Sequence, residues 1–210
     1  MTTFAIFAYD GIESIDIGAT YGVLSMAKRI EPELDFHVLS SQGGEVVMAN
    51  GLRLLADRSI AEYQSADVLM VLGGPGWTSV CEHEETLSFL RLVKSQGTII
   101  ASVCTGGMIL EAAGLLNDCA ATTKVEVFAG EVPPLQILGE RIGTDQTSIA
   151  RVIDAGQILT GGGVSLGIDM TLYLLQRLFS AHVAQETARV LEYSAAWQAN
   201  ADRLPDIVLQ

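Results

Sequence analysis

The stretch that most constrains the fold covers residues 98–112, because it changes from a strand pattern to a helix pattern around Cys104. Residues 98–103 are short, apolar and partly β-branched, which is typical of a buried parallel strand. The apolar residues after Cys104 recur at helical spacing instead. We therefore predict a sharp strand-to-helix turn with the cysteine at its tip. The same geometry presents the nucleophilic serine of α/β hydrolases.

Two interpretations of Cys104 are open. Free N–H groups and the positive end of the helix dipole favour an anion at this turn, so the functional interpretation predicts a reactive thiolate. The small residues Gly106 and Gly107 leave room for a neighbouring strand or a substrate. Free cysteine is also a common buried hydrophobe, which is the structural alternative. The position at an elbow favours the functional interpretation.

Composition restricts the class of protein. The 210 residues are 49% hydrophobic and 18% charged with 21 glycines, which fits one compact α/β domain. Twelve Lys and Arg against 25 Asp and Glu give a net charge of −13, and this weighs against binding to nucleic acid. Three cysteines without CxxC spacing predict neither a disulfide framework nor a zinc site. No basic leader and no membrane-length apolar run are present, so we expect a cytoplasmic protein without membrane contact.

Short apolar runs alternate with segments of helical spacing along the chain. The predicted strands are residues 4–9, 36–40, 67–72 and 98–103. Residues 46–49 and 52–56 predict a β-ribbon, and residues 148–160 predict a hairpin. The alternation predicts a mostly parallel sheet with helices on both faces. We assign residues 1–195 to a single domain and residues 196–210 to a C-terminal tail.

Three loops follow predicted strands and carry candidate functional residues. They contain Asp16, the pair Gly73 and Gly74, and Cys104. Because the carboxyl ends of parallel strands meet at one edge of a sheet, we expect these residues to form one active site.

Other motifs are weaker. The glycine loops match neither the phosphate-binding P-loop nor the G-x-G-x-x-G dinucleotide pattern. Residues 163–167 match G-x-S-x-G, a rival elbow around Ser165. A catalytic triad on this serine would need a later acid and His182, which follows only a helix length downstream. His37, His83 and His182 lack ligand spacing, so no metal site is predicted.

Several motifs together resemble the ThiJ/PfpI superfamily, a group with a class I glutamine amidotransferase-like fold. They are residues 103–107 (VCTGG), 113–116 (AGLL), 121–123 (ATT), 159–163 (LTGGG) and 167–169 (GID). The likeness extends from Phe4 to about Tyr193. Within the superfamily, the sequence looks most like the isocyanide hydratases and the N-terminal domain of AraC-type regulators.

The resemblance implies a flavodoxin-like three-layer α/β sandwich, a homodimer and a small-molecule substrate, without a metal or organic cofactor. It also implies a nucleophilic Cys104 with Asp16 beside it and Thr105 assisting. The matching loop residues Gly73 and Gly74 are expected to offer N–H groups to developing negative charge. We add Gly106 to this expected oxyanion and substrate-binding set.

One departure from the superfamily pattern matters. Lys124 stands where both of these relatives and many hydrolases of the superfamily carry a histidine after the Ala-Thr-Thr segment, so a Cys–His mechanism loses its base. Isocyanide hydration needs only the thiolate of Cys104 as nucleophile and Asp16 as proton shuttle, and it yields an N-substituted formamide. We expect this activity.

Two alternatives stay open. The first is a non-catalytic ligand-sensing or regulatory domain, although residues 200–210 are too few for a DNA-binding helix-turn-helix, so we expect no nucleic-acid partner. The second is a redox sensor that acts through Cys104, because exposed thiols of low pKa oxidise readily.

Overall fold

The computed structural model describes residues 1–209, which are built around an eight-stranded sheet in the order β10-β8-β9-β7-β6-β1-β2-β5. Neighbouring strands are parallel except for the antiparallel pair β8 and β9. The strands of this sheet are β1 (Thr2–Phe7), β2 (Leu34–Ser40), β5 (Arg58–Ser59), β6 (Val68–Val71), β7 (Ile99–Ser102), β8 (Val152–Ala155), β9 (Ile158–Gly161) and β10 (Asp206–Val208). The predicted mostly parallel sheet is confirmed.

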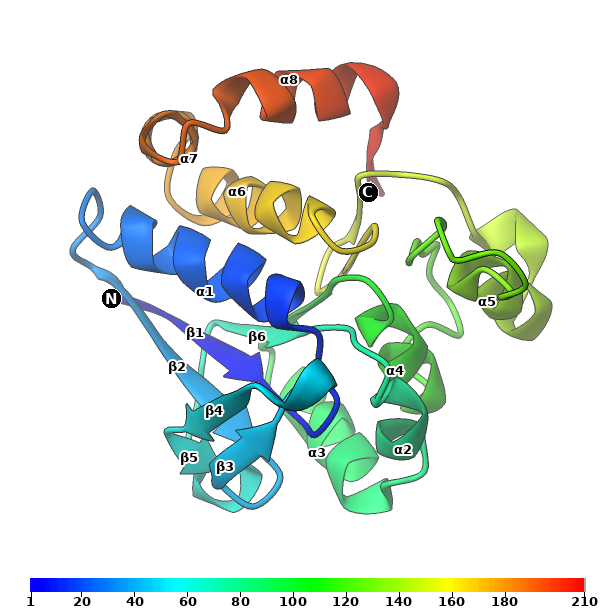
Figure 1. Ribbon diagram of the computed structural model, residues 1–210. Coiled ribbons are helices and arrows are strands. Elements are labelled where there is room, and N and C mark those ends of the chain that lie inside the picture. The colour runs from blue at the N-terminus through cyan, green and yellow to red at the C-terminus, as the bar shows by residue number, and fades with distance from the viewer. Residues whose placement is uncertain (210) are drawn as a thin grey trace.

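Helices cover both faces of the sheet (Figure 1). Helices α1, α6, α7 and α8 lie on one side, and α2, α3 and α4 lie on the other. The helices are α1 (Ser14–Ala27), α2 (Trp77–Cys81), α3 (Glu84–Ser95), α4 (Gly106–Ala112), α5 (Pro134–Ile142), α6 (Leu166–Leu178), α7 (Ala181–Val190) and α8 (Ser194–Arg203). Short 3-10 turns occupy Ala49–Gly51, Ile60–Glu62 and Thr144–Gln146. This arrangement is the predicted flavodoxin-like three-layer sandwich.

The core lies along the central strands. Every residue of β6 is buried, and the last four residues of β1 are fully buried. These strands are apolar without alternation because helices cover both faces of the sheet. The core therefore holds the carboxyl ends of β1, β6 and β7 rigidly side by side, and those ends carry the candidate site.

Two smaller predictions concern antiparallel pairs. The predicted ribbon is present as β3 (Gly44–Val47) and β4 (Arg53–Ala56), which pair outside the main sheet. The predicted hairpin is present as β8 and β9. Within residues 1–209, no helix is long and apolar enough to cross a membrane.

The C-terminal segment differs from the expected tail at residues 196–210. Helix α8 runs on to Arg203, and β10 pairs in parallel with β8 at the edge of the sheet. Buried polar contacts hold this segment. Arg151 donates to Asp206 through Nε (2.8 Å) and contacts Asp169 through Nη1 (3.4 Å). Apolar periodicity carries no signal for such a polar attachment, so the sequence pattern missed it.

Candidate active site

Cys104 lies between β7 and α4. Its backbone φ is +55°, which residues other than glycine rarely adopt. The surrounding chain holds this turn. The Cys104 N–H donates to the Gly162 carbonyl at 3.0 Å, and the Thr123 hydroxyl donates to the Cys104 carbonyl. The Cys104 side chain is only 4% exposed. The predicted strand-to-helix elbow is present, and its nucleophile is buried.

Two glycines allow the elbow to pack closely against the loop after β6. A Cβ atom on Gly73 would lie 2.5 Å from the Thr105 nitrogen and 2.7 Å from the Cys104 Cβ. A Cβ atom on Gly106 would lie 2.0 Å from the Val71 carbonyl oxygen. Gly106 was expected to line the substrate space. Its α-carbon instead faces β6, so its place in the structure is a packing position.

Asp16 lies in the first turn of α1 and is completely buried. Its Oδ2 atom accepts a hydrogen bond from the Gly73 N–H at 2.9 Å. Its Oδ1 atom has no hydrogen-bond partner among the described residues. Burial raises the pKa of Asp16 to about 6, although the Gly73 N–H and the neighbouring Cys104 thiol oppose this increase. At neutral pH the carboxyl group is therefore mainly ionised and has a free oxygen.

The Cys104 thiol behaves differently from the expected thiolate. Burial and the neighbouring charge of Asp16 raise the pKa of Cys104 to about 12. The backbone N–H groups of Val164 and Thr105 and the charge of Lys124 lower it by less. The prediction of an activated resting thiolate is therefore wrong. At neutral pH the site holds a protonated thiol beside an ionised carboxylate.

The glycine loop after β6 positions two side chains. The Gly73 N–H donates to Asp16, and the Gly74 N–H donates to the Thr105 Oγ1 atom at 2.9 Å. Both N–H groups were expected to face developing negative charge. Because they are already engaged, the donors that face the sulfur are the N–H groups of Thr105 and Val164.

Tyr9 belongs to the site, although sequence reasoning did not single it out. Its side chain is 5% exposed, and its hydroxyl donates to the Leu72 carbonyl at 3.0 Å. Burial, together with the charges of Asp16 and Cys104, raises the pKa of Tyr9 well above its ordinary value. Its place just past the carboxyl end of β1, the edge where Asp16 was expected, is the sequence signal that could have identified it.

The G-x-S-x-G motif does not form a serine elbow. Its Val164 contacts Cys104 instead. Val164 has a φ of +55°, and its N–H faces the Cys104 sulfur. Ser165 is exposed at the start of α6. His182 is exposed at the start of α7, beyond the 13-residue helix α6, which is about 20 Å long at 1.5 Å per residue. A triad of Ser165 and His182 is therefore excluded.

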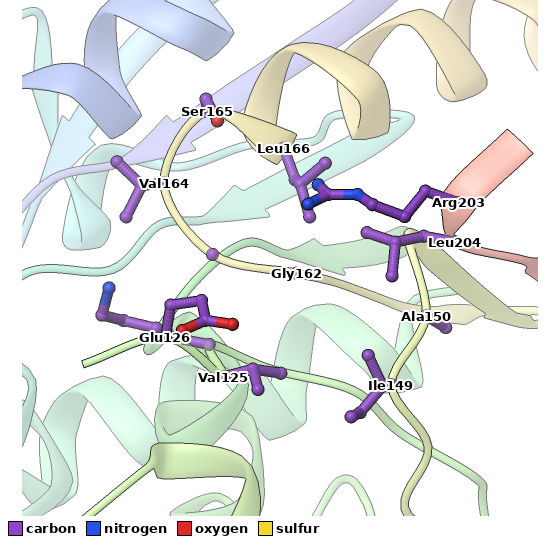
Figure 2. Close-up of a pocket in the computed structure, with 12 residues that line it drawn as sticks. Val125, Glu126, Ile149, Ala150, Gly162, Val164, Ser165, Leu166, Arg203 and Leu204 are labelled. Atoms are coloured by element: carbon purple, nitrogen blue, oxygen red, sulfur yellow. The ribbon is translucent and has the colours of Figure 1, made fainter. Parts of the chain in front are cut away.

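A pocket of about 340 Å³ opens next to the elbow (Figure 2). Neither Cys104 nor Asp16 lines this pocket, but Gly162 and Val164, which contact Cys104, form part of its wall. Lys124 also lines it, and the lysine charge lowers the pKa of both Cys104 and Asp16. The remaining lining residues are Val125, Glu126, Ile149, Ala150, Gly163, Ser165, Leu166, Arg203 and Leu204. The departure at Lys124 thus places a cation in the wall of the pocket, where its charge also acts on Cys104 and Asp16.

The other two cysteines lie outside the site. Cys81 and Cys119 are half-buried free thiols whose sulfur atoms contact the carbonyls of Met108 (3.5 Å) and Leu115 (3.6 Å). Among the described residues, no group of three His, Cys, Asp or Glu side chains could hold a metal ion. The chemistry that this geometry offers is that of one thiol and one carboxylate.

Comparison with known proteins identifies the family of this chain. The model of the DJ-1/PfpI family matches residues 2–177. The chain belongs to the DJ-1/PfpI family. It is 32% identical over 185 residues to the isonitrile hydratase of Pseudomonas putida, a match that covers 88% of this chain and 75% of that protein. The resemblance drawn from the VCTGG, AGLL and LTGGG segments is confirmed.

Regulators of transcription are also similar to this chain. The HTH-type transcriptional regulator CdhR of Pseudomonas aeruginosa is 27% identical over 173 residues. The match covers 80% of this chain and 47% of the regulator, so the chain spans about half of the regulator's length.

Solved structures share the fold. Oxidised DJ-1 of Toxoplasma gondii superposes with a TM-score of 0.77 at 22% identity, covering 92% of this chain and 100% of that chain. A THiJ/PfpI family protein from Pseudomonas syringae superposes with a TM-score of 0.79 at 23% identity, covering 91% of this chain and 75% of that chain.

Proposed function

We propose that this protein hydrates isocyanides to N-substituted formamides, with Cys104 as the nucleophile and Asp16 as the proton shuttle. The observation that carries the proposal is the buried Asp16 carboxylate, which neighbours the Cys104 thiol and whose Oδ1 atom has no hydrogen-bond partner among the described residues. The similarity to the isonitrile hydratase of Pseudomonas putida supports it, since isonitrile is another name for isocyanide.

The first step joins the thiol to the isocyanide. Asp16 accepts the proton of the Cys104 thiol while the sulfur attacks the terminal carbon of R–NC. The carbon then takes this proton from Asp16, which gives the thioimidate R–N=CH–S–Cys104. The raised pKa of Cys104 does not prevent the step, because the carboxylate removes the proton as the C–S bond forms. With its pKa of about 6, Asp16 is ionised at pH 7 yet basic enough to act.

The second step adds water to the thioimidate carbon. Asp16 accepts one proton of the water and passes it to the imine nitrogen, which gives the tetrahedral intermediate R–NH–CH(OH)–S–Cys104. As the C–S bond breaks, Asp16 accepts the hydroxyl proton of this intermediate and transfers it to the Cys104 sulfur, and the product R–NH–CHO leaves. The Lys124 charge and the Val164 N–H stabilise negative charge on the departing sulfur. One isocyanide and one water give one formamide, so the reaction needs no oxidant, reductant or cofactor.

Incubation with phenyl isocyanide tests the proposal through the appearance of formanilide, measured by liquid chromatography. We expect turnover by the unchanged protein and none above background with Cys104→Ala. We expect Asp16→Asn to lose at least about a hundredfold in kcat, the usual contribution of a positioned general base. Cys119→Ala is the matched control, since this thiol lies outside the site, and it should retain full turnover. Normal turnover by Cys104→Ala would exclude the mechanism.

A ligand-sensing role is the second candidate, and the similarity to the regulator CdhR favours it. Stabilisation of the protein by an isocyanide or formamide without turnover would support this role over catalysis. Redox sensing loses its basis, because Cys104 is buried with a raised pKa, whereas oxidation-prone thiols are exposed with a lowered one. The homodimer and the cytoplasmic location stay predictions.

A further inference from the structure

The pocket beside Cys104 carries two cations that form no ion pair with any described residue. Lys124 and Arg203 both line it, and neither belongs to a salt bridge of the described chain. Six other arginines do pair with carboxylates. They are Arg53, Arg91, Arg141, Arg151, Arg177 and Arg189. Of the cations without a salt bridge among the described residues, Lys124 and Arg203 share one pocket, in a chain of net charge −13.

One acidic side chain, Glu126, also lines the pocket, and it too lacks an ion pair within residues 1–209. Two cations and one anion leave the pocket with a net positive charge. Figure 2 shows Arg203 and Leu166 on one side of the Gly162 backbone and Glu126 and Val125 on the other. The charges of Arg203 and Glu126 therefore act on the pocket from opposite sides.

The pocket has a reactive end and a distal end. Val164 marks the reactive end, because its N–H faces the Cys104 sulfur. Arg203 and Leu204 close the opposite side in Figure 2. Apolar side chains line the space between them, namely Val125, Ile149 and Leu166. A volume of about 340 Å³ lies at the small end of the range of ligand pockets. Such a pocket fits a short apolar substituent that ends in an anionic group.

We propose that the preferred substrate is an isocyanide whose apolar substituent carries a carboxylate, with Arg203 binding that carboxylate at the distal end of the pocket. This rests on the proposed isocyanide hydration. The planar guanidinium of arginine can donate two parallel hydrogen bonds to a carboxylate, which fixes the substrate's orientation as well as its charge. The isocyanide group then lies at the Val164 end of the pocket, next to the elbow that holds Cys104 and near the Lys124 charge.

The experiment compares 4-isocyanobenzoate with 4-isocyanobenzamide, two substrates of nearly the same shape that differ in charge. We measure kcat/KM for each and take the ratio of acid to amide. The unchanged protein should favour the acid. Arg203→Gln should lower the ratio by about fivefold, which is the effect of an exposed ion pair worth about 1 kcal/mol. Glu126→Gln should raise the ratio, because it removes a repulsion.

Opposite shifts from two substitutions in the wall of one pocket distinguish an electrostatic role from a structural one, because a disturbed pocket would affect both substrates in the same direction. Arg189→Gln is the matched control, since this arginine pairs with Glu186 on α7, away from the pocket. It should leave the ratio unchanged. Equal turnover of acid and amide, with no change of the ratio in Arg203→Gln, would overturn the inference while isocyanide hydration stands.

A binding measurement separates this inference from the proposed reaction. Calorimetric titration of the protein with 4-formamidobenzoate, the expected product, needs no turnover. We expect binding that Arg203→Gln weakens by about fivefold and that Arg189→Gln leaves unchanged. If neither isocyanide is hydrated but this binding pattern holds, hydration fails and the anion pocket stands. If 4-formamidobenzoate binds equally to the unchanged protein and to Arg203→Gln, the anion pocket is refuted.

Discussion

Replacing Asp16 by asparagine is expected to stabilise the fold above pH 6 while it removes the proposed activity. Burial raises the pKa of Asp16 from an ordinary 3.8 to about 6. Each unit of pKa is worth about 1.4 kcal/mol, so keeping the carboxylate ionised in the core costs about 3 kcal/mol of unfolding free energy. Asparagine has nearly the same shape, can still accept the Gly73 hydrogen bond and carries no charge.

The sign of the pH dependence follows from this raised pKa. Between pH 3.8 and pH 6 the folded protein binds more protons than the unfolded chain, so its stability falls as the pH rises. The stability difference between Asp16→Asn and the unchanged protein should therefore be small at pH 4. It should grow to about 3 kcal/mol by pH 7 and then stay level.

Urea denaturation from pH 4 to pH 8 measures this difference. Asp118→Asn is the matched control, because it makes the same change of charge at an exposed position away from the site. It should alter stability by less than about 0.5 kcal/mol at every pH. A pH-independent difference for Asp16→Asn, or lower stability than the unchanged protein at pH 8, would refute the proposed electrostatic cost.

Three further substitutions probe the elbow, the cation and the C-terminal attachment. Gly73→Ala should destabilise the fold by about 2 kcal/mol in urea denaturation, because its Cβ would overlap the elbow backbone. Lys124→Gln should slow iodoacetamide labelling of Cys104 at pH 9 by a few-fold, because it removes a charge that lowers the thiol pKa. Arg151→Met should cost about 3 kcal/mol, since the buried Asp169 loses its cation, and the melting temperature should fall. Unchanged values would contradict each argument.

The elbow and the convergence of three loops could be predicted from the sequence, because they depend on local residue patterns and on parallel strand order. A short apolar strand, a cysteine and a helical repeat specify the turn around Cys104, and parallel topology brings Asp16 and the Gly73 loop to the same edge. The attachment of α8 and β10 could not be predicted in the same way. It depends on Arg151, a single charged residue that meets its partner Asp206 from a segment 55 residues away.

The protonation state of Cys104 was predicted wrongly because two effects of different size compete. The positive end of a helix favours an anion by about 0.3–1 kcal/mol, whereas burial raises the pKa of an acid by up to several units. The sequence shows the helix start but does not reveal that the cysteine is 4% exposed or that Asp16 lies beside it. The contribution of Val164 was missed for a similar reason, since only the folded chain aims its N–H at the sulfur.

The most direct test of the account is to look for the covalent intermediate on Cys104. The protein is mixed with phenyl isocyanide, quenched with acid after short intervals, and digested for mass spectrometry. We predict that the Cys104 peptide gains the mass of one whole isocyanide, because addition expels no leaving group. Asp16→Asn should form this adduct more slowly, and Cys81 and Cys119 should stay unmodified. Formation of formanilide without any adduct on Cys104, or equal modification of all three cysteines, would contradict the account.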